Sequence, residues 1–190
     1  MEKYTLNNLQ FLEAESIYVI RETAAQFERP VMLYSAGKDS SVLLRLAQKA
    51  FHPGRIPFPL LHVDTALKFP EMYEFRDAVA RETGVEILVR QNQSALDSGA
   101  NPSSLGTVRC CEILKTQALL DAIKDGGYTA AIGGARRQEE RSRAKERIWS
   151  VRDAFGQWSP KRQRPELWNL CNGRLAPGET VRVFPLSNWT

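Results

Sequence analysis

The sequence predicts an α/β fold, an open, mostly parallel twisted sheet with helices on both faces. Three observations predict it. Short apolar runs at 31–34, 59–63, 85–89 and 128–132 are long enough for buried strands. Segments with apolar residues at helical spacing lie between these runs, which is the pattern of βαβ units in a parallel sheet. Polar residues follow the runs, at the edge where such sheets bind ligands.

The elements can be read in order from the N-terminus. An apolar stripe that includes Leu9, Leu12 and Phe27 predicts a helix over 6–28, which Pro30 ends. The later elements rest on the same periodicity and on Gly or Pro breaks. Strands are predicted at 31–34, 59–63, 85–89, 128–132 and 181–186, helices at 40–50, 70–83 and 111–124, and a long polar loop at 91–107.

Length and composition are those of one domain, residues 1–190, with a sizeable core. Apolar content of 43% and charged content of 25% are ordinary for a soluble globular protein. No apolar run approaches the roughly 18 residues of a membrane span, and no signal peptide is visible. We therefore expect a cytoplasmic protein without membrane contact. Three cysteines, two of them adjacent, do not resemble a disulfide framework.

Residues 135–190 form a basic and less regular segment. Residues 134–164 alone hold ten Lys/Arg against four Asp/Glu, whereas the net charge of the whole chain is only +4. A local basic cluster predicts an anionic ligand or partner at that place. The small overall charge argues against nucleic acid, although tryptophans interleaved with arginines also fit a module that binds single-stranded RNA.

The segment Ser35-Ala36-Gly37-Lys38-Asp39-Ser40-Ser41 joins the first strand to a helix, and the rest of the chain is organised around it. A polar turn of this kind aims backbone N–H groups and the helix dipole at an anion, and Lys38 adds a charge. It is not a Walker loop, because Met32 stands where that pattern requires glycine. It resembles the SGGxDS loop of PP-loop ATP pyrophosphatases, with Ala36 in place of a glycine. Those proteins cleave ATP between the α- and β-phosphates.

Further motifs make the resemblance specific. LLHVDT at 60–65, GGARRQEERSRAKER at 133–147, QRPELWN at 163–169 and VFPLSNWT at 183–190 occur in the order and spacing of one family. The chain resembles the small, ATP-binding subunits of bacterial sulfate adenylyltransferase, within the PP-loop and sulfonucleotide reductase superfamily. The resemblance implies an adenine nucleotide α-hydrolase-like fold. It also implies the formation of adenosine 5′-phosphosulfate and pyrophosphate from ATP and sulfate, a larger GTPase partner subunit, and a C-terminal region beyond residue 190.

Site roles follow from the loop and from the resemblance. Sulfate is already an oxyanion, so the reaction needs positioning and charge stabilisation rather than a side-chain base. We expect ATP and its pyrophosphate to contact Ser35, Ala36, Gly37, Lys38, Asp39, Ser40, Ser41 and Asp64. The expected catalytic residues are Lys38, Arg136, Arg137 and Arg143. Arg137 and Arg143 are assigned to sulfate or the α-phosphate, because guanidinium groups clamp tetrahedral oxyanions.

Two carboxylates have alternative roles. Asp39 is expected to hold Mg²⁺, and its alternative role is capping of the following helix. Asp64 is expected to accept from a ribose hydroxyl or join the Mg²⁺ shell, and its alternative role is a turn after the strand. His62, inside an apolar run, is expected to be a hydrogen-bonded core residue rather than a catalyst.

Cys110 and Cys111 support a different function. Iron–sulfur members of the sulfonucleotide reductases carry an adjacent cysteine pair at a similar place, together with a later C-x-x-C. Cys171 stands alone in this sequence, so no later pair is present. We interpret the adjacent pair as residues at a helix start, and an APS or PAPS reductase remains the alternative function.

Overall fold

The computed structural model describes residues 5–139, 143–166 and 170–190. Within these residues one six-stranded sheet has the order β3-β2-β1-β4-β6-β5. The strands are β1 (Pro30–Leu33), β2 (Leu60–Val63), β3 (Ile87–Arg90), β4 (Ala130–Ile132), β5 (Trp149–Arg152) and β6 (Thr180–Val183). All neighbours are parallel except β5 with β6, which confirms the mostly parallel sheet.

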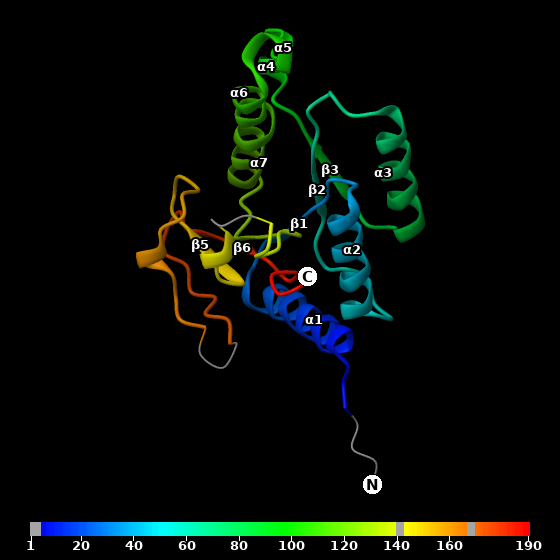
Figure 1. Cartoon of the computed structure of the whole chain (residues 1–190), viewed down its shortest axis with the longest axis vertical. Coiled ribbons are helices and arrows are strands. Elements are labelled where there is room, and N and C mark those ends of the chain that lie inside the picture. The colour runs from blue at the N-terminus through cyan, green and yellow to red at the C-terminus, as the bar shows by residue number, and fades with distance from the viewer. Residues whose placement is uncertain (1–4, 140–142, 167–169) are drawn as a thin grey trace.

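Helices cover both faces of the sheet, as predicted. One face packs against α1 (Asn8–Gln26), α2 (Lys38–Phe51) and α3 (Pro70–Thr83), and the other against α7 (Ala118–Asp125). Successive side chains of β1 point to opposite faces of the sheet. Met32 packs into the core beneath α1, α2 and α3, and Val31 packs into the core beneath α7. Figure 1 shows the strands between the α7 column and the α1–α2 pair.

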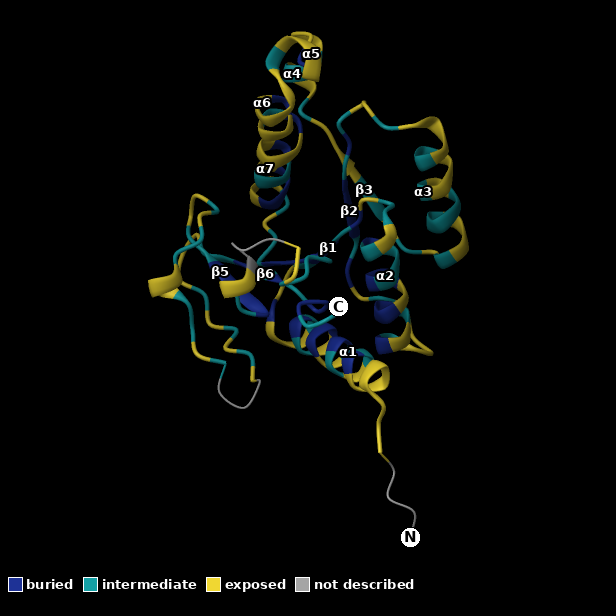
Figure 2. Ribbon diagram, viewed as in Figure 1, coloured by how far each residue is buried: buried dark blue, intermediate teal, exposed yellow. Residues whose placement is uncertain are grey.

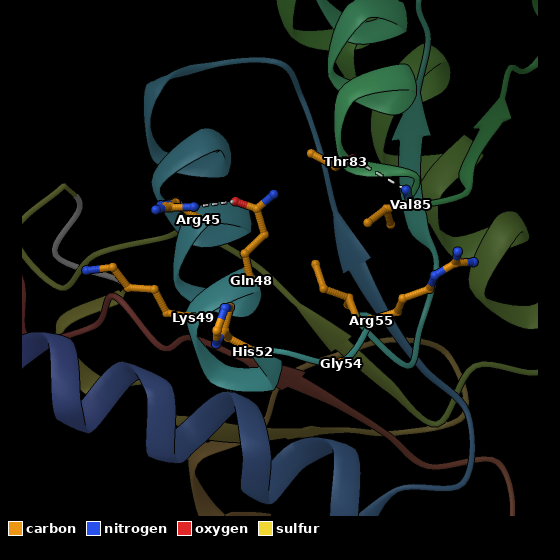
Figure 3. A pocket seen from close by; sticks show the side chains of 9 residues that line it. Arg45, Gln48, Lys49, His52, Gly54, Arg55, Thr83 and Val85 are labelled. Atoms are coloured by element: carbon orange, nitrogen blue, oxygen red, sulfur yellow. Dashed lines mark hydrogen bonds between the residues drawn. The ribbon is translucent and has the colours of Figure 1, made fainter.

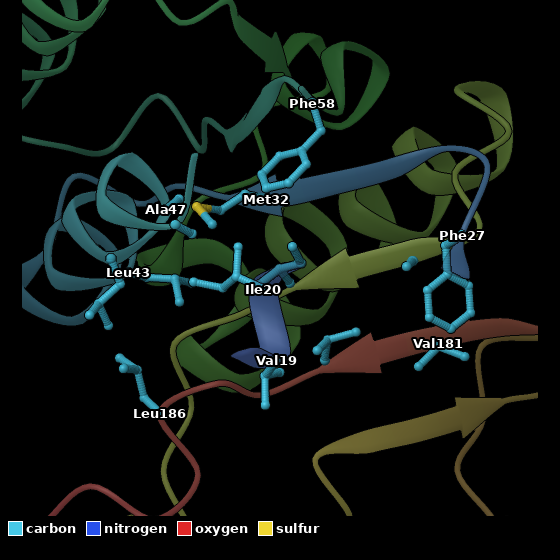
Figure 4. Close-up of a cluster of buried hydrophobic side chains, with 14 of the residues drawn as sticks. Val19, Ile20, Phe27, Met32, Leu43, Ala47, Phe58, Val181 and Leu186 are labelled. Carbon is cyan, nitrogen blue, oxygen red and sulfur yellow. The ribbon is translucent and has the colours of Figure 1, made fainter. Parts of the chain in front are cut away.

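The larger core lies between α1, α2 and the sheet. Ile20 of α1, Leu43 of α2 and Met32 of β1 are fully buried there, and Figure 4 shows them converging from three elements. Burying each such side chain stabilises the fold by about 1.5–3 kcal/mol. Figure 2 shows the consequence for α1, α2 and α7, each of which has a buried inner face and an exposed outer face.

The first helix begins at Asn8, directly after its capping residue Asn7. Asn7 and Gln10 form a reciprocal capping box, each side chain accepting from the other's backbone N–H at 2.9 Å. Leu9, assigned to the apolar stripe, is 60% exposed, so its place in the core was predicted wrongly. The cap starts the helix before its apolar face reaches the sheet.

The predicted loop at 91–107 contains two short helices, α4 (Gln93–Asp97) and α5 (Pro102–Leu105). Asn92 and Asn101 accept from backbone N–H groups inside these helices, at 3.2 Å from Ala95 N and 2.9 Å from Ser104 N. Polar residues that suggest a loop here act as helix caps. The loop prediction was therefore wrong in part.

The helix predicted at 111–124 begins earlier, at Thr107. It runs through α6 (Thr107–Cys111), a π-helical turn η1 (Glu112–Gln117) and α7. Cys110 and Cys111 thus lie in the first helix of this column, three and four residues after its start. Gly106, with φ of 75°, separates this column from α5, a conformation that glycine adopts without strain.

The basic segment contains two of the six strands. β5 was not predicted, and β6 ends at Val183 rather than at Leu186, since Pro185 lacks the N–H that a ladder requires. Two 3₁₀ turns, η2 (Arg143–Lys145) and η3 (Pro160–Arg162), complete the described elements. Among the described helices, none combines the length and the apolar character needed to cross a membrane.

Candidate nucleotide-binding site

The phosphate loop lies where the strand order reverses. β1 is paired with β2 on one side and β4 on the other, so its carboxyl end opens at the switch point of the sheet. The first backbone bond of α2 runs from Ser41 N to Gly37 O, at 3.0 Å. The preceding N–H groups of the first turn therefore point out of the helix, together with its positive dipole end. This is the geometry of an anion site.

Ser40 fixes the shape of the loop. Its buried hydroxyl donates to Gly37 O at 2.9 Å, accepts from Gly37 N at 3.1 Å, and lies 3.2 Å from the Ser35 hydroxyl. These hydrogen bonds hold the turn closed. Ala36 has φ of 59°, in the left-handed region that favours glycine. The loop keeps its glycine-type conformation with an alanine in place.

A cavity of about 460 Å³ opens beside this loop, above the ends of β1 and β2. Its walls combine apolar side chains suited to a base with two lysines suited to phosphates. The lining residues are Leu33, Tyr34, Ser35, Gly37, Leu61, Val63, Thr65, Lys68, Met72, Cys111, Lys115 and Leu119.

Sequence reasoning missed Lys68, Met72 and Lys115 as part of this cavity. A signal for the helical wall was present, because Cys111, Lys115 and Leu119 are spaced four residues apart and so share one helix face. No periodicity marks Lys68, which lies in the turn after β2. Its place depends on the tertiary fold.

Asp64 is held by internal hydrogen bonds. Oδ1 accepts from Tyr73 Oη at 2.8 Å and Ala66 N at 3.0 Å, and Oδ2 accepts from Gln91 Nε2 at 2.7 Å. Burial raises the pKa of Asp64, but these bonds and the charge of Lys68 outweigh it, and the net pKa lies below its usual value. The carboxylate organises the turn after β2 and the start of the loop after β3.

His62 is buried and bonded at both nitrogens, as expected of a core histidine. Nδ1 lies 2.8 Å from Tyr34 O, and Nε2 lies 2.8 Å from Lys68 Nζ, which also donates to Val63 O at 2.9 Å. An Nδ1–H tautomer satisfies all three contacts. Burial chiefly, and then the charge of Lys68, lower the pKa of His62. Burial likewise lowers the pKa of Lys68.

The glycine-arginine segment after β4 meets the start of α2. Arg136 Nη2 lies 3.9 Å from Asp39 Oδ1, and Lys38 Nζ lies 4.0 Å from the same oxygen. Glu139 also contacts Arg136, with its carboxylate 3.5 Å from Nε. The structure thus brings together Lys38, Asp39 and Arg136. Lys38 is 76% exposed, so its ammonium is free to move toward a bound phosphate.

Arg137 turns away toward the end of the chain. Its guanidinium donates to Asn188 Oδ1, and Asn188 Nδ2 donates to both carboxylate oxygens of Glu15 in α1. Trp189 Nε1 donates to Ser16 Oγ at 2.8 Å. The VFPLSNWT motif therefore fastens α1 to the arginine segment. The fourth expected arginine, Arg143, starts η2, and its side chain lies outside the described residues.

The two adjacent cysteines face different surroundings. Cys110 is buried against Ala100 and Leu114, whereas Cys111 is exposed and lines the nucleotide cavity. In the described part of the chain no three His, Cys, Asp or Glu side chains gather to hold a metal ion. Cys110 is therefore a core residue, and Cys111 forms part of the wall of the nucleotide cavity.

A second hollow, of about 300 Å³, lies at the opposite end of α2 (Figure 3). Arg45 there donates to Gln48 Oε1 at 3.2 Å, and Lys49 reaches Glu13 at 2.6 Å. Its walls include Ile56 and Val85, which precede β2 and β3. It therefore lies at the amino ends of the strands, away from the phosphate loop.

Comparison with known proteins agrees with this geometry. The chain is 58% identical over 98% of its length to "Sulfate adenylyltransferase subunit 2" of Akkermansia muciniphila, and 59% identical over 100% to the protein of that name from Escherichia coli O157:H7. It spans 62% and 63% of the length of these relatives.

Solved structures show the same fold at low sequence identity. The phosphoadenylyl-sulfate (PAPS) reductase from Candida auris has a TM-score of 0.62 and 16% identity, covering 98% of this chain and 83% of that one. The FMN adenylyltransferase of Candida glabrata has a TM-score of 0.62 and 14% identity, covering 99% of this chain and 55% of that one. The family model described as "Phosphoadenosine phosphosulfate reductase domain" matches residues 29–190. The chain therefore belongs to the phosphoadenosine phosphosulfate reductase domain family.

Proposed function

We propose that this chain is the ATP-binding part of a sulfate adenylyltransferase, which transfers AMP from ATP to sulfate. The observation that carries the proposal is its 57–60% identity, over 97–100% of its length, to proteins named sulfate adenylyltransferase subunit 2. The phosphate loop and the adjoining cavity support it, because they offer an anion site next to an apolar pocket.

In the proposed reaction a sulfate oxygen attacks the α-phosphorus of ATP. A bond forms between that oxygen and phosphorus, the bond from phosphorus to the bridging oxygen of the β-phosphate breaks, and pyrophosphate leaves with both electrons. No proton moves, so no general base is needed. The first turn of α2, Lys38 and Arg136 stabilise the charge that grows on the leaving group. The cavity holds the adenosine so that the α-phosphate lies at the loop.

The site fits a magnesium ion that accompanies the nucleotide. Asp39 offers one carboxylate, 35% exposed, at the start of α2, whereas both oxygens of Asp64 are already bonded. Magnesium in ATP sites is held by one or two carboxylates, phosphates and water, so one protein ligand is sufficient. Bound there, Mg²⁺ would neutralise charge on the phosphates. Lys38 and Arg136 near Asp39 would supply the remaining positive charge.

The same proposal extends to partners and place. The name "subunit 2" of the relatives supports a partner subunit, and the resemblance of the motifs supports a larger GTPase in that role. Sulfate is the second substrate, and the use of ATP and GTP supports a cytoplasmic location.

Exchange of radiolabelled pyrophosphate into ATP tests the proposal. The complete protein, purified with its partner subunit, is expected to catalyse exchange only when sulfate is present. Sulfite release with a thiol donor, together with iron absorbance, would instead support the reductase alternative. Strong RNA binding that persists without ATP, with no exchange, would support the RNA-binding alternative.

A further inference from the structure

A polar face lies on the outer side of the β5–β6 pair. Ser150 is directly opposite Arg182 in the antiparallel register, and Arg152 follows two residues later on the same side. Trp158 forms an isolated bridge with Arg152 and extends this face. We call Ser150, Arg152, Trp158 and Arg182 the β5–β6 polar face. Their neighbours Trp149, Val151, Val181 and Val183 point into the core on the opposite side.

Each member of this face carries a buried polar atom without a partner. Among the described residues, Ser150 Oγ, Arg152 Nε, Trp158 Nε1 and Arg182 Nη1 are shielded from solvent and make no hydrogen bond. Three of the four are N–H donors. Leaving one buried donor unpaired costs about 1–3 kcal/mol, so a cluster of them is a signature of a missing acceptor.

The charge of the cluster is positive. Glu146 is the acidic side chain at this cavity, and it is paired with Nη2 of Arg152. Burial first, and then the charge of Arg152, lower the pKa of Arg182 to about 10, and Glu146 offsets this only in part. A second negative charge nearby would raise the pKa of Arg182 back toward its usual value.

Three members of this face, Arg152, Trp158 and Arg182, line a cavity of about 460 Å³ that adjoins the nucleotide cavity. Gly133 and Ala135, from the segment after β4, form another part of its wall. Leu33 of β1 and Leu119 of α7 line both cavities, so the two spaces adjoin at these side chains. An anion held here would therefore lie beside the cavity in which the proposed function places the nucleotide.

We propose that the β5–β6 polar face and its cavity bind a tetrahedral oxyanion, which in the proposed reaction is the acceptor sulfate. Sulfate carries four acceptor oxygens and no donor, which matches a cavity lined by the guanidinium donors of Arg152 and Arg182 and the indole donor of Trp158. Arg137, assigned to sulfate from the sequence, has its guanidinium bonded to Asn188 instead. The identity of the anion rests on the proposed function, but binding at the site does not.

Calorimetric titration with inorganic sulfate tests the site without any turnover. The unaltered chain is expected to bind sulfate, and Arg182→Gln is expected to weaken binding about tenfold or more. Trp158→Phe keeps an aromatic side chain but removes the indole N–H together with part of the ring system, so it is expected to weaken binding several-fold; its melting temperature is measured alongside to confirm that it is folded. This second variant keeps the test decisive if Arg182→Gln unfolds the chain.

Arg162→Gln is the matched control, because Arg162 is an exposed arginine of the same basic segment. It is expected to leave sulfate affinity unchanged. Equal affinity in the unaltered chain, Arg182→Gln and Trp158→Phe would overturn the proposed site. In the exchange assay the two face variants are expected to raise KM for sulfate and leave KM for ATP unchanged. Sulfate binding that depends on this face, without exchange activity, would overturn the proposed function and retain the site.

Discussion

Gly134 packs directly on the backbone of Asp39. A Cβ at position 134 would lie 3.2 Å from Asp39 Cβ and 3.3 Å from the Asp39 carbonyl carbon. The segment after β4 and the start of α2 therefore touch with no room for a side chain between them. This contact sets the position of Arg136 relative to the phosphate loop.

Gly134→Ala is expected to separate these two segments. Overpacking against backbone costs about 1–3 kcal/mol, and here it moves Arg136 away from Asp39. ATP affinity, measured by calorimetry, should fall several-fold. Gly133→Ala is the matched control, since its nearest heavy atoms would lie at an ordinary 3.8 Å. A similar loss of affinity in both variants would contradict this explanation.

Ala36→Gly is expected to stabilise the protein. Alanine in the left-handed conformation costs about 1–2 kcal/mol, which glycine would relieve. The greater freedom of glycine in the unfolded chain offsets about 0.4–1 kcal/mol of this stabilisation. The free energy of unfolding in urea should rise by about 0.5–1 kcal/mol. Ala66, with φ of 56°, lies outside the phosphate loop. Ala66→Gly should give the same gain in stability, and a loss in both would refute the strain argument.

Lys38→Ala is expected to lower the exchange rate on the order of 10²-fold, because a preorganised charge at the leaving pyrophosphate is removed. Stability should change little, since the side chain is largely exposed. Lys49→Ala provides a control at the other end of the same helix, where the lysine pairs with Glu13. An unchanged rate for Lys38→Ala would contradict the assignment of the phosphate loop.

His62 is expected to make stability depend on pH. Its pKa in the folded protein lies below that of the unfolded chain, about 6.5, so the unfolded state binds more protons in this window. Stability should therefore fall as pH decreases from about 6.5 through the folded pKa. Nuclear magnetic resonance titration of the imidazole measures that pKa. In Lys68→Met it should move upward, and a downward shift would contradict the role given to Lys68.

Cys111 is expected to react with iodoacetamide while Cys110 does not, because only Cys111 is exposed. Saturating ATP should protect Cys111, since it lines the nucleotide cavity. Peptide mass spectrometry after timed labelling measures both effects. Cys111→Ser should remain able to bind ATP. Equal labelling with and without ATP would argue against nucleotide in this cavity.

The sequence predicted those parts of the fold that local pattern determines. Apolar runs located β1, β2 and β4, and the helix at 70–83 has the predicted bounds. β5 escaped prediction because only Trp149 and Val151 point their apolar side chains into the core, and Ser150 between them and Arg152 after them resemble a solvated segment. Their burial depends on the pairing with β6.

The candidate site likewise has a part that local sequence predicts and a part that depends on the tertiary fold. The phosphate loop is one continuous segment, so its motif was recognisable. The structure adds the ion pair between Asp39 and Arg136, which meet at the carboxyl ends of two strands. Lys68 and Lys115 come from separate elements, and no local pattern marks them as neighbours. The expected roles of all these site residues toward ligands, from the phosphate loop and Asp64 to the arginines, stay predictions.

The register of β1 with β4 has a consequence for biosynthesis. Pro30 pairs with Ala130, so the two strands that form the switch point are 100 residues apart in the chain. A ribosome that has made the phosphate loop and α2 has not yet made the strand that completes the site. Until then one edge of β1 has open hydrogen-bonding groups that can pair with another chain. Nascent chains that stop before β4 should therefore depend on chaperones and bind no nucleotide.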